Sequence, residues 1–225
     1  MLDIGGLLGE FFKKPIFIII VVVAIIGALV WSYVSKTIQS NKQKTAEKQA
    51  SEVVITDLTN VDSAEYDEPT KNEYAVAAAK AGEANPKLLL AAISVEIPPS
   101  LGLKSANTRY IFVSDKDIIN NWTITFASDT GNFIRAIIPK DDYMGNPSVM
   151  DTKLWKFNYV TALQISEKDG GKAWRENNEL KGITLTLKHG DPNNWLTWTV
   201  DYQGNNSSFT RKIDANSGKI VESNI

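Results

Sequence analysis

The stretch Leu196-Thr197-Trp198-Thr199-Val200-Asp201-Tyr202 decides the fold of this chain. Its apolar side chains alternate with two threonines and an aspartate, which predicts a β-strand with one buried and one solvated face. The cluster Gly204-Asn205-Asn206-Ser207 follows, and Gly and Asn tolerate the positive φ of a tight turn. The chain is therefore expected to return as the second strand of a hairpin.

The same pattern occurs 76 positions earlier in the chain. Trp122-Thr123-Ile124-Thr125-Phe126 aligns without gaps onto Trp198-Thr199-Val200-Asp201-Tyr202. At the same offset, Phe133-Ile134-Arg135-Ala136-Ile137 aligns onto Phe209-Thr210-Arg211-Lys212-Ile213. Because the agreement extends over both strands and the turn between them, we interpret the C-terminal part of the chain as two copies of one module.

Helices are expected ahead of the strands in both copies. Asn85-Pro86 places a capping residue before a proline, which predicts a helix through Ile93 that Pro98-Pro99 ends. Residues 71–81 are rich in alanine and predict a second helix, and residues 152–166 predict the helix of the second copy. Gly170-Gly171 is expected to break that last helix. Further strands are expected at residues 109–114, 183–188 and 219–222.

Near the N-terminus, residues 15–34 (PIFIIIVVVAIIGALVWSYV) hold no charged side chain. At about 1.5 Å rise per residue, a helix of this length spans about 30 Å, the thickness of the hydrocarbon core of a bilayer. Trp31 and Tyr33 near its end are typical of aromatic side chains at the membrane interface. We therefore expect a transmembrane helix here.

Two questions about this segment stay open. A signal peptide is the alternative to an anchor, but signal peptides have an apolar region of about 7–15 residues followed by small residues. The longer run and its bulky end favour a retained anchor. We expect the N-terminus in the cytoplasm and the C-terminal part outside it, because a large domain after a single early anchor can be translocated. Lys36, Lys42, Lys44 and Lys48 oppose this orientation under the positive-inside rule.

The polar segment that follows, residues 35–70, is expected to be a solvated stalk. Its lysines leave an anionic-lipid patch as the alternative. The chain as a whole has a formal net charge of −2 and no cysteine. This balance gives no electrostatic footprint for nucleic acid, and the lack of cysteine excludes disulfides, zinc–thiolate sites and thiol catalysis.

Arg135 and Arg211 occupy equivalent places in the two copies, and they are the candidate partner-binding residues. A guanidinium on an otherwise apolar strip can receive a peptide carboxylate. The alternative is structural, because the same group can stack on an aromatic ring or pair with a cross-strand acid such as Asp201. Trp122 and Trp198 are expected to be structural anchors between helix and sheet.

The remaining polar motifs favour turns over chemistry. His189 is the single histidine and lies in His189-Gly190-Asp191-Pro192, which predicts an exposed turn. Asp214-x-Asn216-x-Gly218 is similar to the opening of a calcium loop, but the later ligands are missing, so a turn is expected there too. No Gly-x-Ser-x-Gly or Ser-x-x-Lys arrangement is present. We expect no catalytic residue, metal, cofactor or small-molecule substrate.

A helix followed by antiparallel strands, with Trp-x-Val-x-Tyr and then Phe-x-Arg-x-Ile-Asp-Ala-x-x-Gly-Lys-Ile, resembles the PepSY and cystatin-like group. The second copy carries the whole pattern through Asp214-Ala215-Asn216-Ser217-Gly218-Lys219-Ile220-Val221, whereas the first has Pro139-Lys140-Asp141-Asp142 in place of that ending. Similar proteins with one anchor and two such modules occur in bacterial cell envelopes. The resemblance implies a non-enzymatic module outside the cytoplasm that binds or restrains peptidases and other wall enzymes.

The sequence thus predicts an α+β protein with two tandem modules, each a helix packed on a three- or four-stranded antiparallel sheet. The expected order is a cytoplasmic tail (1–14), a transmembrane helix (15–34), a polar stalk (35–70), a first module (71–145) and a second module (146–225). The expected function is non-catalytic binding of a protein partner, such as a peptidase or cell-wall enzyme. The alternatives are an assembly subunit of a membrane complex, with the transmembrane helix as the main contact, and an enzyme.

Overall fold

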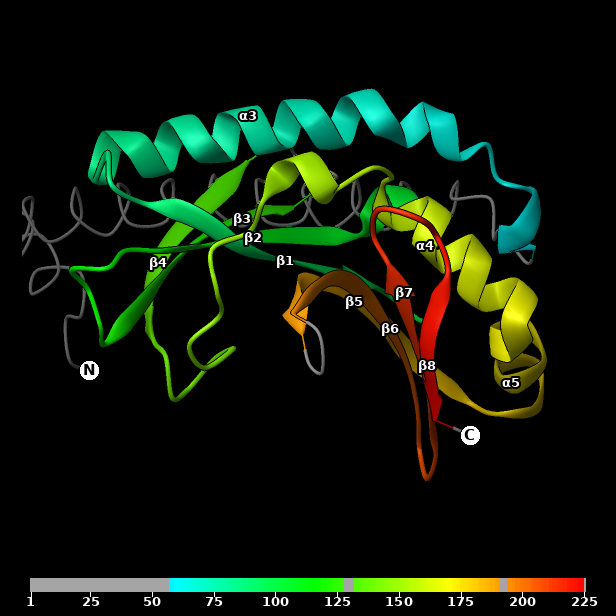
Figure 1. Ribbon diagram of the computed structural model, residues 1–225. Helices are drawn as coiled ribbons and strands as arrows, with labels where there is room; N and C mark the ends of the chain where they lie inside the picture. The colour runs from blue at the N-terminus through cyan, green and yellow to red at the C-terminus, as the bar shows by residue number, and fades with distance from the viewer. Residues whose placement is uncertain (1–56, 128–131, 191–193, 225) are drawn as a thin grey trace, which may run out of the picture. The chain divides into compact units, whose positions relative to one another are not determined.

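The computed structural model describes residues 57–127, 132–190 and 194–224 (Figure 1). The described residues all belong to one compact unit, Val54–Ile225. The predicted tail, the apolar run 15–34 and the stalk up to residue 56 lie outside the described residues. In chain order the elements are η1 (Leu58–Asn60), η2 (Ser63–Tyr66), α3 (Asp67–Ala84), β1 (Leu89–Ile97), η3 (Leu103–Ser105), β2 (Asn107–Val113), β3 (Asn120–Ala127), β4 (Phe133–Pro139), η4 (Thr152–Leu154), α4 (Tyr159–Ser166), η5 (Glu167–Gly171), α5 (Lys172–Asn177), β5 (Leu180–Gly190), β6 (Trp195–Gly204), β7 (Ser208–Asp214) and β8 (Ile220–Asn224).

All eight strands belong to one antiparallel sheet, in the order β4-β3-β2-β1-β5-β6-β7-β8. The α+β class is confirmed, but the prediction of two separate sheets of three or four strands is wrong. The two halves are joined because β1 pairs with β5 over Ala92–Ile97 and residues 183–188. This pairing uses the inner edge of each half, so within the described part of the chain β4 and β8 are the open edges of the sheet.

The predicted helix through Ile93 is also wrong, because residues 89–97 form the central strand β1. Asn85 and Pro86 lie in the turn that connects α3 to this strand. Ala92 and Ile93 point to opposite faces of the sheet, and both are almost completely buried. A strand covered on both faces is apolar throughout and lacks the two-residue alternation, so its pattern is hard to tell from that of a buried helix.

The other helices follow the sequence more closely. The alanine-rich helix is confirmed as α3, which is longer than predicted at both ends. The expected helix 152–166 begins later, because η4 and an extended connection precede α4, whose first turn is capped by the Asn158 side chain. Its break at Gly170-Gly171 is confirmed. Gly170 has a φ of +103°, and α5 begins at Lys172, directly after the glycine pair.

The two hairpins predicted from the repeat are confirmed, with the same register in both. Trp122 lies opposite Ile137 and Trp198 opposite Ile213, while Phe126 pairs with Phe133 as Tyr202 pairs with Phe209. Their places in the sheet differ, because β3–β4 ends at an open edge, whereas β6–β7 is followed by one more strand. The three further strands expected from the sequence are confirmed as β2, β5 and β8.

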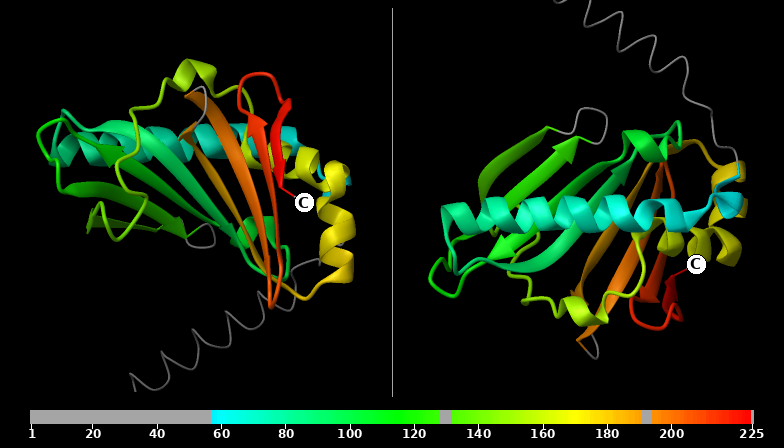
Figure 2. Two further views of the ribbon diagram at one scale, coloured as in Figure 1. Left: turned by 60° about the horizontal axis from the view of Figure 1, so that its bottom comes forward. Right: turned by 90° about the horizontal axis from the view of Figure 1, so that it is seen from above.

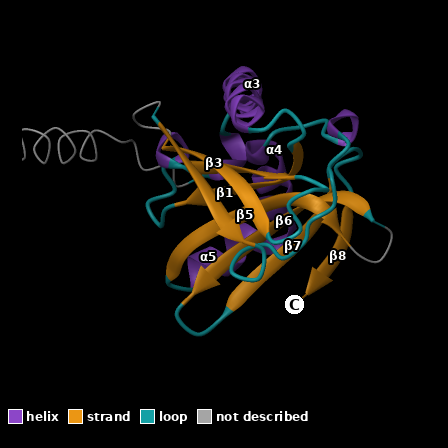
Figure 3. Cartoon of the chain, turned by 90° about the vertical axis from the view of Figure 1, so that its left-hand side faces the viewer, coloured by secondary structure: helices purple, strands orange, loops and turns teal. Residues whose placement is uncertain are grey.

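The helices cover one face of the sheet, which we call the helix face. The Tyr110 hydroxyl donates to the backbone oxygen of Thr70 in α3, and the Trp198 indole donates to the backbone oxygen of Phe157, next to α4. Both side chains point to the same side of the sheet in the strand register. Helix α3 lies across the strands in Figure 2 and above them in Figure 3. The hydrophobic core fills the space between these helices and the sheet.

The opposite face is covered unevenly. Over β2 and β3 it is covered by the connection that follows β4, where the Asn121 side chain donates to the backbone oxygens of Tyr143 and Gly145. Over the second half it carries threonines and charged side chains that are half-buried, among them Thr186, Thr199 and Lys212. The alternation that predicted one wet face for residues 196–202 is therefore confirmed for β6, and β5 and β7 show the same alternation of burial.

The folded part begins within the segment assigned to the stalk. Leu58 is completely buried, and the Gln164 side chain in α4 donates to the backbone oxygens of Leu58 and Val61. Residues from about 57 onward are thus tied to the core. Among the residues that the structure describes, no helix is long and apolar enough to span a bilayer.

The pH dependence of stability gives a test of the packing of α3. Burial raises the pKa of Glu73, whose carboxylate is 3.5 Å from the Tyr110 hydroxyl. A carboxyl group with a raised pKa holds its proton more tightly in the folded state, so stability falls as the pH rises from its ordinary pKa through its folded-state pKa. We expect Glu73→Gln to raise the melting temperature at pH 7, and this advantage to vanish below about pH 4.

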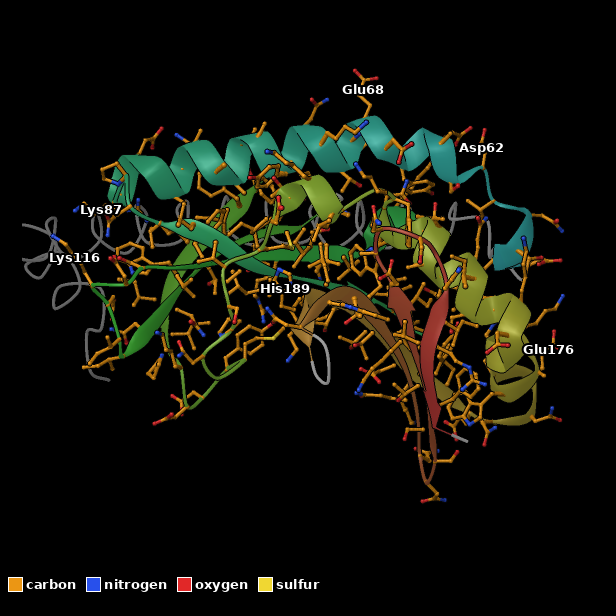
Figure 4. The ribbon with its side chains drawn as sticks, viewed as in Figure 1. Asp62, Glu68, Lys87, Lys116, Glu176 and His189 are labelled. Carbon is orange, nitrogen blue, oxygen red and sulfur yellow. The ribbon has the colours of Figure 1, made fainter. Side chains whose placement is uncertain are left out.

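The control for this measurement is Glu68→Gln. Glu68 lies on the same helix, and it points away from the sheet (Figure 4). It is in the first turn, where a negative charge stabilises the helix dipole, so its replacement should leave the melting temperature unchanged or lower it slightly. Equal effects of the two substitutions at pH 7 would contradict the assignment of a buried carboxyl group to Glu73.

Candidate functional site

The two arginines that match in the sequence lie in different environments. Arg211 on β7 is buried, and its guanidinium forms an ion pair with Asp169, with Nε 2.6 Å from Oδ2. The guanidinium also donates to the backbone oxygen of Asp169 at 3.0 Å and lies 4.0 Å from the centre of the Phe209 ring. Arg211 therefore has the structural role that the sequence left as an alternative. Its acid is Asp169, and Asp201 instead accepts a hydrogen bond from Thr210.

The turn that presents Asp169 depends on the two glycines after it. Gly170 adopts a φ of +103°, which side chains rarely allow. A Cβ on Gly171 would lie 2.5 Å from the Tyr202 hydroxyl and 2.8 Å from the backbone oxygen of Ser166. The glycine pair thus permits both the reversal after α4 and the close approach of this turn to β6 and β7.

Arg135 lies on the edge strand β4 and is exposed. It is paired across the ladder with Ile124, which offers no charge. No hydrogen bond or ion pair joins its side chain to another described residue. Of the two candidate partner-binding residues, Arg135 is exposed and Arg211 is buried.

Every second residue of β4 directs its backbone N–H and C=O groups away from β3, its neighbour in the sheet. The Ala127 amide donates to the oxygen of Asn132, and at the other end of the hairpin the Lys140 amide donates to the oxygen of Ile119. In an antiparallel pair such bonded positions alternate with positions whose N–H and C=O groups point away from the partner strand. Asn132 and Lys140 are therefore bonded positions, and the alternation between them makes Phe133, Arg135 and Ile137 outward positions, whichever end is used for the count. The next outward position is Pro139, which has no N–H group.

Large apolar side chains surround this edge. On β4 the exposed fractions are 39% for Phe133, 71% for Ile134 and 52% for Ile137. In the loop before β3, Ile118 is 78% exposed and Ile119 67%. We call the six residues Ile118, Ile119, Phe133, Ile134, Arg135 and Ile137 the β4 edge. A cluster of exposed apolar side chains on an open strand is typical of a contact surface for another protein.

The loop that carries the two isoleucines is fixed by Asp117. Its carboxylate accepts hydrogen bonds from the Asn120 amide at 2.9 Å and from the Ile119 amide at 3.2 Å. It also accepts from the Trp122 indole at 3.4 Å. These hydrogen bonds, the Asn120 amide first, lower the pKa of Asp117, so its carboxylate stays charged and the loop stays in place at neutral pH. Lys116 of this loop and Lys87 after α3 lie at the same end of the folded unit (Figure 4).

The two tryptophans differ in burial. Trp198 is 1% exposed and packs in the core between β6 and the helices, which is the position predicted for an anchor. Trp122 is only partly buried, and it packs against the same core cluster while its indole reaches Asp117. Both point to the helix face of the sheet.

The remaining sequence candidates have local roles. His189 lies in the strand β5 and not in a turn, and its ring is 2.6 Å from the backbone oxygen of Asn194 through Nδ1. Because a carbonyl can only accept, Nδ1 carries the proton. Asp214 accepts hydrogen bonds from the Asn216 and Ser217 amides and so closes the turn to β8. Within the described residues, no three side chains of the metal-binding types come together.

Sequence reasoning found Arg135 but missed the apolar residues of the β4 edge. The sequence gives little indication of this surface, because Phe133, Ile134 and Ile137 are ordinary strand residues. Their exposure follows only from the position of β4 at the edge of the sheet. Ile118-Ile119, placed between Asp117 and Asn120 in a polar loop, was the better clue.

Comparisons with known proteins add little to this site. No protein-family profile matches the chain, and no curated protein matches it. Among solved structures, the chain is similar to a putative lipoprotein from Clostridium difficile 630, with 13% sequence identity and a TM-score of 0.43. The similarity covers 64% of this chain and 86% of that chain. A likeness at this level does not identify a family or an activity.

The different environments of the two arginines can be tested by matched substitutions. Arg211→Ala removes a buried guanidinium with several hydrogen bonds and should lower the free energy of unfolding by about 2 kcal/mol. Arg135→Ala removes an exposed and unpaired side chain and should change it by less than about 0.5 kcal/mol. Chemical denaturation of the full-length chain in detergent measures both. Similar losses for the two variants would show that the arginines are equivalent after all.

Proposed function

We propose that this chain is a non-catalytic protein that binds a protein partner through the β4 edge. The observation that carries the proposal is the combination of an open edge strand, exposed apolar side chains and the unpaired guanidinium of Arg135. Monomeric proteins rarely leave a long apolar edge strand free, because such an edge pairs with other chains. An edge that is kept open is therefore best explained by a partner that covers it.

We also propose that the chain is anchored in a membrane by residues 15–34 and acts outside the cytoplasm. The length and apolar character of that run support the anchor, and the resemblance to PepSY proteins supports the outer location. The same resemblance makes a peptidase or a cell-wall enzyme the kind of partner to test first. Arg211 is buried against Asp169, and Asp214 closes the turn to β8, so we assign structural roles to both.

The binding function can be tested by photo-crosslinking in cells. A benzoylphenylalanine at position 134 places the reactive group on the β4 edge, and one at position 205 places it on the exposed turn between β6 and β7. We expect an adduct with a second protein from position 134, none from position 205, and loss of the adduct when Ile137→Asp puts a charge on the edge. Equal adducts from both positions, or an adduct that survives Ile137→Asp, would contradict a partner site at this edge.

The location can be tested with a single introduced thiol, because the chain has no cysteine. Ser217 is exposed in the turn before β8, so Ser217→Cys should react with a membrane-impermeant maleimide in intact cells. Gly5→Cys in the predicted cytoplasmic tail is the control, and it should react only after lysis. The reverse pattern would place the folded unit in the cytoplasm.

A further inference from the structure

We propose that the partner presents an extended segment that adds to the sheet as a ninth strand beside β4, with an acidic side chain opposite Arg135. This inference rests on the proposed function and specifies what the β4 edge recognises. It has two parts, a set of backbone hydrogen bonds and a charge preference, and each part follows from separate observations.

The backbone part follows from the hydrogen-bond pattern of the hairpin. Phe133, Arg135 and Ile137 direct their N–H and C=O groups away from β3, and no other described residue accepts or supplies these hydrogen bonds. An incoming strand can use all of these groups at once, since they are spaced as in any antiparallel or parallel ladder. Pro139 offers only a carbonyl, so the added strand is expected to pair fully over Phe133–Ile137 and to end near the proline.

The side-chain part follows from the alternation along β4. Phe133, Arg135 and Ile137 all point to the helix face, while Ile134 points to the other face. A partner strand therefore meets two apolar neighbours with a guanidinium between them. The preferred partner sequence is apolar, then acidic, then apolar at every second residue, because cross-strand apolar pairs and opposite charges are favourable.

The surrounding charges place the acidic residue at Arg135. Lys80, which lies 5.9 Å from the centre of the Phe133 ring, is already paired with Glu83 at 2.8 Å. Lys140 follows Pro139, but its Nζ is bound to Asn146 Oδ1 at 2.9 Å, and Asp141 and Asp142 come directly after it. These two carboxylates disfavour a further acid at that end of the strand. Arg135 is thus the cation of this edge that has no acid beside it.

A second copy of this chain is a less favourable occupant. Two copies can pair their β4 strands antiparallel so that Phe133, Arg135 and Ile137 of each copy all form backbone hydrogen bonds. In this register Arg135 lies opposite Arg135 of the other copy. Like charges directly opposite each other are destabilising in a β-ladder. The same guanidinium that attracts an acidic partner therefore disfavours pairing of the protein with itself.

The test uses a short labelled peptide as the probe. The sequence Ser-Val-Thr-Glu-Thr-Val-Ser presents the same side chains in either chain direction, so the result does not depend on whether the added strand is parallel or antiparallel. The matched peptide carries Lys in place of Glu. Binding to the full-length protein in detergent is measured by fluorescence anisotropy, and protection of the amides of residues 133, 135 and 137 is measured by hydrogen exchange.

We expect the Glu peptide to bind the wild-type protein about fivefold more tightly than the Lys peptide. Arg135→Glu should reverse this preference, because it exchanges the sign of the charge without changing the backbone. Ile137→Pro should abolish binding of both peptides, since it removes one outward N–H group and leaves the ladder with β3 intact. Ile137→Val is its control and should bind as the wild type does.

Each contrary result overturns a stated part of the inference. Equal binding of the two peptides, or no reversal by Arg135→Glu, overturns the acidic preference. Binding that survives Ile137→Pro, a lack of amide protection, or no binding of the Glu peptide at millimolar concentration overturns strand addition. The proposed function is tested separately, by the crosslink from position 134. If this crosslink persists in Ile137→Pro, the partner binds the β4 edge without adding a strand. A crosslink to a second copy of the chain overturns the assignment of the occupant.

Discussion

The pairing of β1 with β2 on one side and β5 on the other holds this structure together. Among the described residues, β1 is the strand of the first half that pairs with the second half, and seven of its nine residues are buried. The helices then cover a single continuous face, and the two halves share one core. Any change that weakens β1 therefore affects both halves, although they read as separate modules in the sequence.

The joined sheet also explains why two matching hairpins have different uses. β7 is covered on its outer side by β8, and its helix face is covered by the turn that carries Asp169. The arginine of that hairpin is consequently enclosed. β4 has no neighbour on its outer side among the described residues, so the arginine at the matching position stays exposed. Position in the sheet, and not local sequence, separates a structural arginine from a candidate binding residue.

The sequence predicted the local features well and the long-range ones poorly. Alternation and turn residues located the hairpins, because each hairpin is specified by contacts between neighbours in the chain. Residues 89–97 were not recognised as the strand β1, because a largely apolar strand that is buried on both faces has no two-residue alternation. The single sheet was not predicted, and neither was the identity of its edge strands β4 and β8, because the residues of a strand do not specify which strand pairs with it. The importance of Ile134 and Ile137 followed only once β4 was known to be an edge.

The glycine pair after α4 has a consequence for recognising related chains. Gly170 is required by its backbone conformation and Gly171 by the Tyr202 hydroxyl that lies against it, so two separate constraints act on neighbouring positions. Asp169 and Arg211 complete the same arrangement. Related proteins whose overall similarity has been lost should therefore still keep Asp-Gly-Gly together with the later Tyr and Arg. That combination would serve as an evolutionary fingerprint of the fold, whereas the β4 edge would be free to diverge with each partner.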